Sequence, residues 1–145
     1  MGKCIYCMGE TERMISYVGF NWIGKEEITN FCCSDEHYQE IIKFNNYVNK
    51  NCVKFIVLVL ILSLSTCATI PLAFYIKNLY IAVLIGYLPI FLLATIIVKY
   101  PFVTPETTQR YGMEKTIKTT KIIGHWGQLF CVIFAVVTTV IGILV

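Results

Sequence analysis

The sequence predicts a mainly α-helical membrane protein that has three transmembrane helices and a small N-terminal α+β module. Of the 145 residues, 57% are hydrophobic and only 14% are charged. The apolar residues gather in three long runs without charge, and two close-spaced Cys/His pairs lie before the first run. We therefore expect a cytosolic module at residues 1–52 and a membrane domain at residues 53–145.

The three apolar runs have the length of membrane-spanning helices. Residues 55–76, 78–98 and 126–145 contain no Asp, Glu, Lys or Arg. About 20 apolar residues are needed for a helix to cross the bilayer core. In lipid the backbone must satisfy its own hydrogen bonds, so each run is expected to be a helix. Buried core helices of a soluble protein are the weaker alternative, because three such runs occur in one small chain.

The distribution of basic residues predicts the orientation of these spans. Lys and Arg accumulate on the cytoplasmic side of membrane proteins. Six basic residues precede the first run and five lie between the second and third runs, whereas the first hairpin carries only Lys77. We therefore expect the N-terminus and residues 99–125 in the cytoplasm and Val145 outside.

The N-terminal module shows signals for both strands and a helix. Apolar segments between residues 14 and 31, with a glycine-containing turn, predict two or three short strands. Ser34 then offers an N-cap, and Asp35 places negative charge in the first turn. The helix is expected over residues 35–51. It can continue into the first apolar run, because no Pro or Gly intervenes before Pro71.

The connection at residues 99–125 predicts two short helices at the membrane surface. Thr104 and Pro105 supply an N-cap and a first-turn proline, and Gly112 supplies a stop. A second helix is expected over residues 113–123, with lysines among its apolar residues. The connection has five basic and two acidic residues, a net charge of +3, so anionic lipid is its expected partner. An ordinary solvated loop is the alternative.

Four residues have the spacing of a metal site. Cys4 and Cys7 form a Cys-x-x-Cys pair, and Cys33 and His37 lie four residues apart at the start of the expected helix. A Cys and a His one helical turn apart face the same way, so both can reach one ion. Two such pairs are typical of a tetrahedral, structural Zn²⁺ site. Unrelated buried cysteines and a redox Cys-x-x-Cys are the alternatives, and Cys32 could replace its neighbour as a ligand.

A family resemblance follows from this pattern. A Cys-x-x-Cys pair, a short β region and then Phe31-Cys32-Cys33-Ser34 before a helix resembles the FCS-type or TRASH-like treble-clef zinc fingers. The resemblance covers residues 3–40. It implies a treble-clef fold with the ligands Cys4, Cys7, Cys33 and His37, where His37 stands in place of the commoner Cys. Small prokaryotic membrane proteins with such a finger ahead of hydrophobic helices look similar, which implies the plasma membrane of a prokaryote.

Charge narrows the function classes. Residues 1–52 contain five basic and seven acidic residues, a net charge of −2, so we expect no binding to nucleic acid. No ionisable residue lies deep in a span, which disfavours an ion-coupled transporter. The sequence predicts a non-enzymatic membrane protein whose finger binds a protein partner or promotes self-association.

Two other functions stay open at this point. Polar residues in the spans could line a small homo-oligomeric pore that the finger gates or assembles. A membrane-bound enzyme that modifies lipid could instead use Glu106, Arg110, Glu114 and His125 on the inner face. The i, i+4 spacing of Glu106 and Arg110 favours a simple ion pair on a helix surface.

Overall fold

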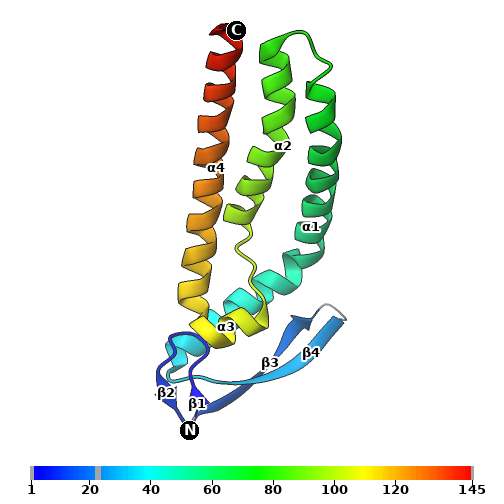
Figure 1. Cartoon of the computed structure of the whole chain (residues 1–145). Coiled ribbons are helices and arrows are strands. Elements are labelled where there is room, and N and C mark those ends of the chain that lie inside the picture. Colours follow the sequence, from blue (N-terminus) through cyan, green and yellow to red (C-terminus); the bar gives the residue numbers. More distant parts are fainter. Residues whose placement is uncertain (1, 22–23, 145) are drawn as a thin grey trace. The chain divides into compact units, whose positions relative to one another are not determined.

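The computed structural model describes residues 2–21 and 24–144, and every structural statement below concerns these residues. The chain is mostly helical, with a small N-terminal β region (Figure 1). The elements are β1 (Gly2–Lys3), β2 (Glu10–Thr11), β3 (Met14–Asn21), β4 (Gly24–Phe31), α1 (Asp35–Ala73), α2 (Leu79–Lys99), α3 (Pro105–Tyr111) and α4 (Met113–Leu144).

The chain divides into two compact units. The first combines the described part of residues 1–53 with residues 101–120, and the second combines residues 54–100 with the described part of residues 121–145. The connection after α2 thus contributes most of its length to the same unit as the N-terminal residues. The helices α1 and α4 each begin in the first unit and continue into the second.

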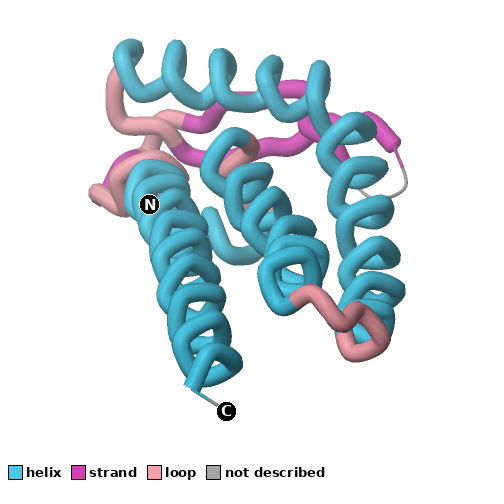
Figure 2. Tube along the Cα trace, turned by 90° about the horizontal axis from the view of Figure 1, so that it is seen from above, coloured by secondary structure: helices cyan, strands magenta, loops and turns pink. Residues whose placement is uncertain are grey.

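Two antiparallel strand pairs build the β region of the first unit. β1 pairs with β2, and β3 pairs with β4 in a hairpin whose register runs from Met14 opposite Phe31 to Asn21 opposite Gly24. The hairpin lies along the first part of α1 (Figure 2). Side-chain amides of α1 hold it there: Asn49 Nδ2 donates to the Val18 carbonyl at 3.0 Å, and Asn45 donates to the same oxygen.

Residues from the N-terminal part of the chain and from the start of α4 form the core of the first unit. Met113 in the first turn of α4 is only 4% exposed, and it packs with the fully buried Ile41 of α1. The contacts explain why residues 101–120 join this unit. The buried apolar residues of this cluster are Cys4, Ile5, Ile15, Cys32, Ile41 and Met113.

Helix starts and stops follow local sequence signals. Ser34 Oγ accepts a hydrogen bond from the His37 amide at 3.2 Å at the start of α1. Thr104 Oγ1 accepts from the Thr107 amide at 3.4 Å, and Gly112 ends α3 with a φ of +84°. The predicted caps at Ser34 and Thr104 and the predicted stop at Gly112 are thereby confirmed. α1 continues without a break into the first apolar run, as the absence of Pro and Gly allows.

The third long helix differs from the expectation. The sequence pattern predicts a separate helix that ends near residue 123, but α4 is continuous from Met113 to Leu144. Gly124 does not interrupt it, because this glycine lies at a close contact with α2. A Cβ added there would lie 2.6 Å from Val98 Cγ2 and 3.2 Å from the Ala94 carbonyl oxygen. The glycine thus allows close packing between the two helices.

The second unit consists of apolar helix segments. Within the described residues, three helices are long and apolar enough to cross a membrane, and these are α1, α2 and α4. Few of their side chains are buried inside the unit. Leu64 of α1 is 70% exposed, Leu84 of α2 is 60% exposed and Phe134 of α4 is 57% exposed. The apolar surface of this unit therefore faces outward.

Small and polar residues join α2 to α4. A Cβ added at Gly127 would lie 3.2 Å from the Ala94 Cβ, so the two backbones run close together there. Gln128 Nε2 donates to Thr95 Oγ1 at 2.9 Å, and Tyr87 and Thr138 join their hydroxyl groups at 3.0 Å. Small residues at the contact and hydrogen bonds across it are how helices associate in an apolar solvent.

The α2–α4 contact can be tested at Gly124. We expect Gly124→Ala to lower the free energy of unfolding in detergent by about 1–3 kcal/mol, because the added methyl group overlaps Val98. Chemical denaturation followed by circular dichroism measures this change. The double variant Gly124→Ala/Val98→Ala should recover part of the loss. If Gly124→Ala is as stable as the wild type, Gly124 does not pack closely against Val98.

Candidate metal centre

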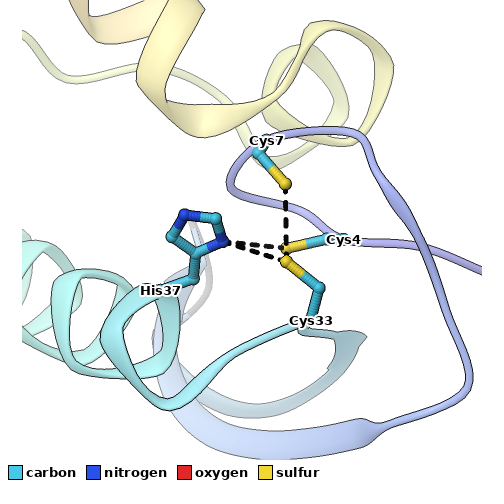
Figure 3. A group of neighbouring side chains, drawn as sticks. All are labelled: Cys4, Cys7, Cys33 and His37. Carbon is cyan, nitrogen blue, oxygen red and sulfur yellow. Dashed lines mark hydrogen bonds between the residues drawn. The ribbon is translucent and has the colours of Figure 1, made fainter.

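Three thiols and one imidazole converge in the first unit. The sulfur atoms of Cys4, Cys7 and Cys33 and a ring nitrogen of His37 all lie within 4.8 Å of one another. Cys4 and Cys7 come from the turn between β1 and β2, whereas Cys33 precedes α1 and His37 lies in its first turn. In Figure 3 the side chains point toward a common centre. The structure thus brings together the four residues that the sequence spacing singles out.

The distances among these atoms suit one bound ion. His37 Nδ1 lies 3.0 Å from Cys33 Sγ and 4.0 Å from Cys4 Sγ, and Cys7 Sγ lies 3.5 Å from Cys33 Sγ. Around a tetrahedral Zn²⁺ ion, with bonds of about 2.3 Å to sulfur and about 2.0 Å to nitrogen, neighbouring donors lie roughly 3.5–3.8 Å apart. The observed distances bracket this range. The group could therefore hold a metal ion after small side-chain adjustments.

Backbone hydrogen bonds hold the first pair of thiols in a tight turn. The Cys4 amide donates to the Gly9 carbonyl at 2.7 Å, and the Met8 amide donates to the Cys4 carbonyl at 2.8 Å. Met8 has a φ of +67°, a conformation that is uncommon for a residue other than glycine. Such strain is kept only where the surrounding structure requires it. We call residues 4–9 the knuckle.

Further backbone bonds connect the knuckle to the second pair. The Ile5 amide donates to the Phe31 carbonyl at 2.9 Å. The Cys32 amide donates to the Arg13 carbonyl at 3.0 Å. The first bond joins the knuckle to the end of β4, and the second holds Cys32 to the segment between β2 and β3. Together they place Cys33 beside the knuckle before α1 begins. The Ser34 cap then directs His37 into the same group, because it sets the first turn of α1.

Cys32 lies next to the group but has a different environment. Its thiol is fully buried and donates to the Ser34 carbonyl at 3.1 Å. Burial raises the pKa of the Cys32 thiol, and the nearby Cys4 sulfur raises it further. A neutral thiol with its own acceptor is a packing group. The structure thus places Cys33, and not Cys32, among the four converging side chains.

The electrostatics of the group favour a cation. Burial would raise the pKa of Cys4, but the backbone N–H groups of Cys7, Cys33 and Tyr6 outweigh it and lower this pKa to about 6. The pKa of Cys33 is raised to about 12, by loss of water around its sulfur and by the adjoining sulfurs of Cys7 and Cys4. Without a metal, the cluster therefore favours one thiolate, at Cys4, and disfavours a second, at Cys33. A divalent cation would remove this repulsion, which is why the donor set fits a metal.

The His37 ring has a stacking partner that the sequence pattern does not reveal. The ring of Tyr6 lies 4.5 Å from the His37 ring, centroid to centroid, with an angle of 29° between the planes. Tyr6 is thus part of the knuckle and also supports the fourth donor. No sequence signal marks this pair, because 31 positions separate Tyr6 from His37 and only the fold brings them together.

Three residues of the lipid-enzyme alternative have local contacts. Glu114 pairs with Lys118 at 2.6 Å, and His125 Nδ1 lies 3.1 Å from Gln128 Oε1. The Arg110 guanidinium lies 5.4 Å from the centre of the Tyr111 ring. Glu106 lies exposed in the first turn of α3. These contacts are typical of helix surfaces.

Comparison with protein-family models, with curated proteins and with solved structures finds no match for this chain. The chemistry of the cluster therefore rests on its own geometry.

Single substitutions should separate the four converging residues from Cys32. We expect one metal ion per chain in the purified protein, lost in Cys7→Ser and in His37→Ala, because three donors hold an ion much more weakly than four. Elemental mass spectrometry measures the ratio of metal to protein. Cys32→Ser and Cys67→Ser serve as matched controls and should keep the metal. Metal loss in Cys32→Ser together with retention in Cys33→Ser would exchange the roles of these two neighbours.

Metal affinity should fall as the pH falls. The metal-free group binds more protons than the metal-bound group, because thiols and an imidazole must lose their protons to coordinate. Protons therefore compete with the metal, and the competition grows toward acid pH. Titration against a chromophoric chelator at pH 8, 7 and 6 measures the affinity. An affinity that does not change over this range would argue against thiolate ligation.

Proposed function

We propose that this chain is a non-enzymatic integral membrane protein in which a zinc-stabilised N-terminal finger serves as a protein-interaction or assembly module. The observation that carries the proposal is the convergence of Cys4, Cys7, Cys33 and His37. Four protein donors fill a tetrahedral coordination shell and leave no position for water or substrate. A metal held in this way supports structure.

The donor chemistry supports zinc as the metal. Thiolate and imidazole ligands suit Zn²⁺, whereas Ca²⁺ and Mg²⁺ take oxygen ligands. A small module gains much from such an ion, because its own core is limited. The order of elements also supports the resemblance to FCS-type and TRASH-like treble clefs. A Cys-x-x-Cys knuckle, the β3–β4 hairpin and then a helix with a ligand in its first turn follow one another.

The exposed apolar surface of the second unit supports insertion into a membrane. Large apolar side chains such as Ile61, Leu64 and Phe134 are each more than half exposed. Contact of so large an apolar surface with water is unfavourable, whereas lipid chains remove this cost. The excess of basic residues before the first span and between the second and third supports a cytoplasmic N-terminus. A reducing cytoplasm would also keep the thiols available to the metal.

The charge and surface of the finger support a protein as its partner. Residues 1–52 carry a net charge of −2, and three thiolates with one Zn²⁺ add a further −1. On one face of the hairpin, Met14 is 63% exposed and Val18 is 52% exposed, and Val18 lies opposite the exposed Glu27. An apolar and acidic surface of this kind suits a partner protein with basic residues, or a second copy of the chain.

The two alternatives receive less support from the contacts. Several polar residues that could line a pore already have partners within the chain. Thr95 accepts from Gln128, and Thr138 bonds Tyr87. Glu114 and His125 of the lipid-enzyme alternative likewise have local partners on their helix. We therefore favour an interaction role for the finger over a pore or a lipid-modifying enzyme.

The proposal is tested by comparing Cys33→Ser with the wild type in cell membranes. We expect the wild-type protein to stay in the membrane during alkaline extraction and to be solubilised by detergent. It should carry one zinc ion and cross-link to a partner or to itself. Cys33→Ser should stay in the membrane but lose zinc and the cross-linked species. Cys67→Ser is the matched control. A Cys33→Ser protein that lacks zinc but keeps every cross-link would contradict an interaction role for the finger.

A further inference from the structure

The knuckle makes direct backbone contact with the first turn of α4. The Met113 amide donates to the Ile5 carbonyl at 2.8 Å, and the Glu114 amide donates to the Tyr6 carbonyl at 3.3 Å. The first N–H groups of any helix have no acceptor inside the helix. A side chain at the preceding residue usually supplies one. Here that residue is Gly112, which has no side chain, and the knuckle carbonyls take its place.

The contact at Gly112 is too close for a side chain. A Cβ added there would lie 3.0 Å from the Tyr6 carbonyl oxygen and 3.0 Å from Met8 Cγ. The φ of +84° also favours glycine at this position. The next side chain, Met113, is buried against the knuckle residues Cys4 and Ile5 in the core cluster. The start of α4 thus depends on the knuckle for both its hydrogen bonds and its packing.

The two carbonyl groups that receive α4 lie between two of the converging thiols. Ile5 and Tyr6 are the x-x residues of the pair formed by Cys4 and Cys7. An ion that draws both sulfurs to one point would therefore fix the direction of both carbonyls. Tyr6 adds a second link, because its ring stacks on His37 while its carbonyl accepts from α4.

We infer that metal binding at the Cys/His cluster is coupled to the order of the first turns of α4, with Gly112 and Met113 as positioning residues for the metal site. The inference rests on the metal binding in the proposed function. With the ion bound, the knuckle caps α4. Without it, nothing draws the sulfurs of Cys4 and Cys7 to one point, the knuckle loosens and residues 113–117 fray. Because α4 is continuous to Leu144, the third apolar helix begins at the metal site.

Coupling of this kind is reciprocal. If the ion stabilises the start of α4, then a well-formed start of α4 must raise the affinity for the ion by the same factor. A substitution at Gly112 should therefore weaken metal binding, although Gly112 donates nothing to the metal. This consequence separates the coupling from a simple contact between neighbouring segments.

Hydrogen exchange on the full-length protein in detergent tests the coupling directly. We expect removal of zinc by a chelator to speed exchange at the amides of residues 113–117 by about tenfold or more. Met113 and Glu114 lose their knuckle acceptors, and the first turn that they begin frays with them. Amides of residues 130–140 serve as the internal control and should not change. Stoichiometric zinc that is removed without any change at residues 113–117 would overturn the coupling and leave the metal site intact. Absence of bound zinc would overturn the proposed function and the coupling together.

Zinc affinity of Gly112→Ala tests the reciprocal effect. We expect the affinity to fall about tenfold, a size typical of residues that support metal ligands. Gly86→Ala is the matched control, because a Cβ there would meet only the Ala73 Cβ at an ordinary 3.7 Å. Circular dichroism confirms that each variant is helical. A folded Gly112→Ala protein with wild-type zinc affinity would overturn the coupling.

Discussion

The convergence of three thiols and one imidazole is the interaction on which the first unit depends. The group consists of Cys4, Cys7, Cys33 and His37, and its atoms lie within 4.8 Å of one another. Without a metal, such a cluster disfavours the thiolate form, because the adjoining sulfurs and the loss of water raise the pKa of Cys33. A bound cation would stabilise the thiolates and hold the four side chains together. The strained backbone at Met8 and the Ser34 cap are then understandable as parts that direct the donors to one point.

The unit that carries the Cys/His cluster is not confined to the N-terminal part of the chain. Residues 101–120 belong to the same compact unit, and Met113 lies in its core. The connection between the second and third apolar helices thus completes the module that the first residues begin. One consequence is that a fragment ending at residue 52 would expose the surface that Met113 covers. Two continuous helices, α1 and α4, begin in the first unit and continue into the second.

The sequence predicts well those features that depend on neighbouring residues. The Cys-x-x-Cys turn, the Cys33/His37 spacing, the Ser34 and Thr104 caps and the stop at Gly112 all act within one or two helical turns. Features that depend on contacts between residues far apart in the chain are not predicted from the sequence. The Tyr6–His37 stack and the burial of Met113 require a fold that brings remote segments together. The continuity of α4 is likewise not predicted, since the sequence pattern divides this segment into a surface helix over residues 113–123 and a span that begins at residue 126.

X-ray absorption at the zinc edge of the purified full-length protein tests the central claim most directly, because it reports the type and distance of every ligand. The geometry of the cluster predicts three sulfur ligands at about 2.3 Å and one nitrogen ligand at about 2.0 Å, with no water. A four-sulfur shell would mean that Cys32 replaces His37. A shell of oxygen and nitrogen would contradict a metal centre built from Cys4, Cys7, Cys33 and His37.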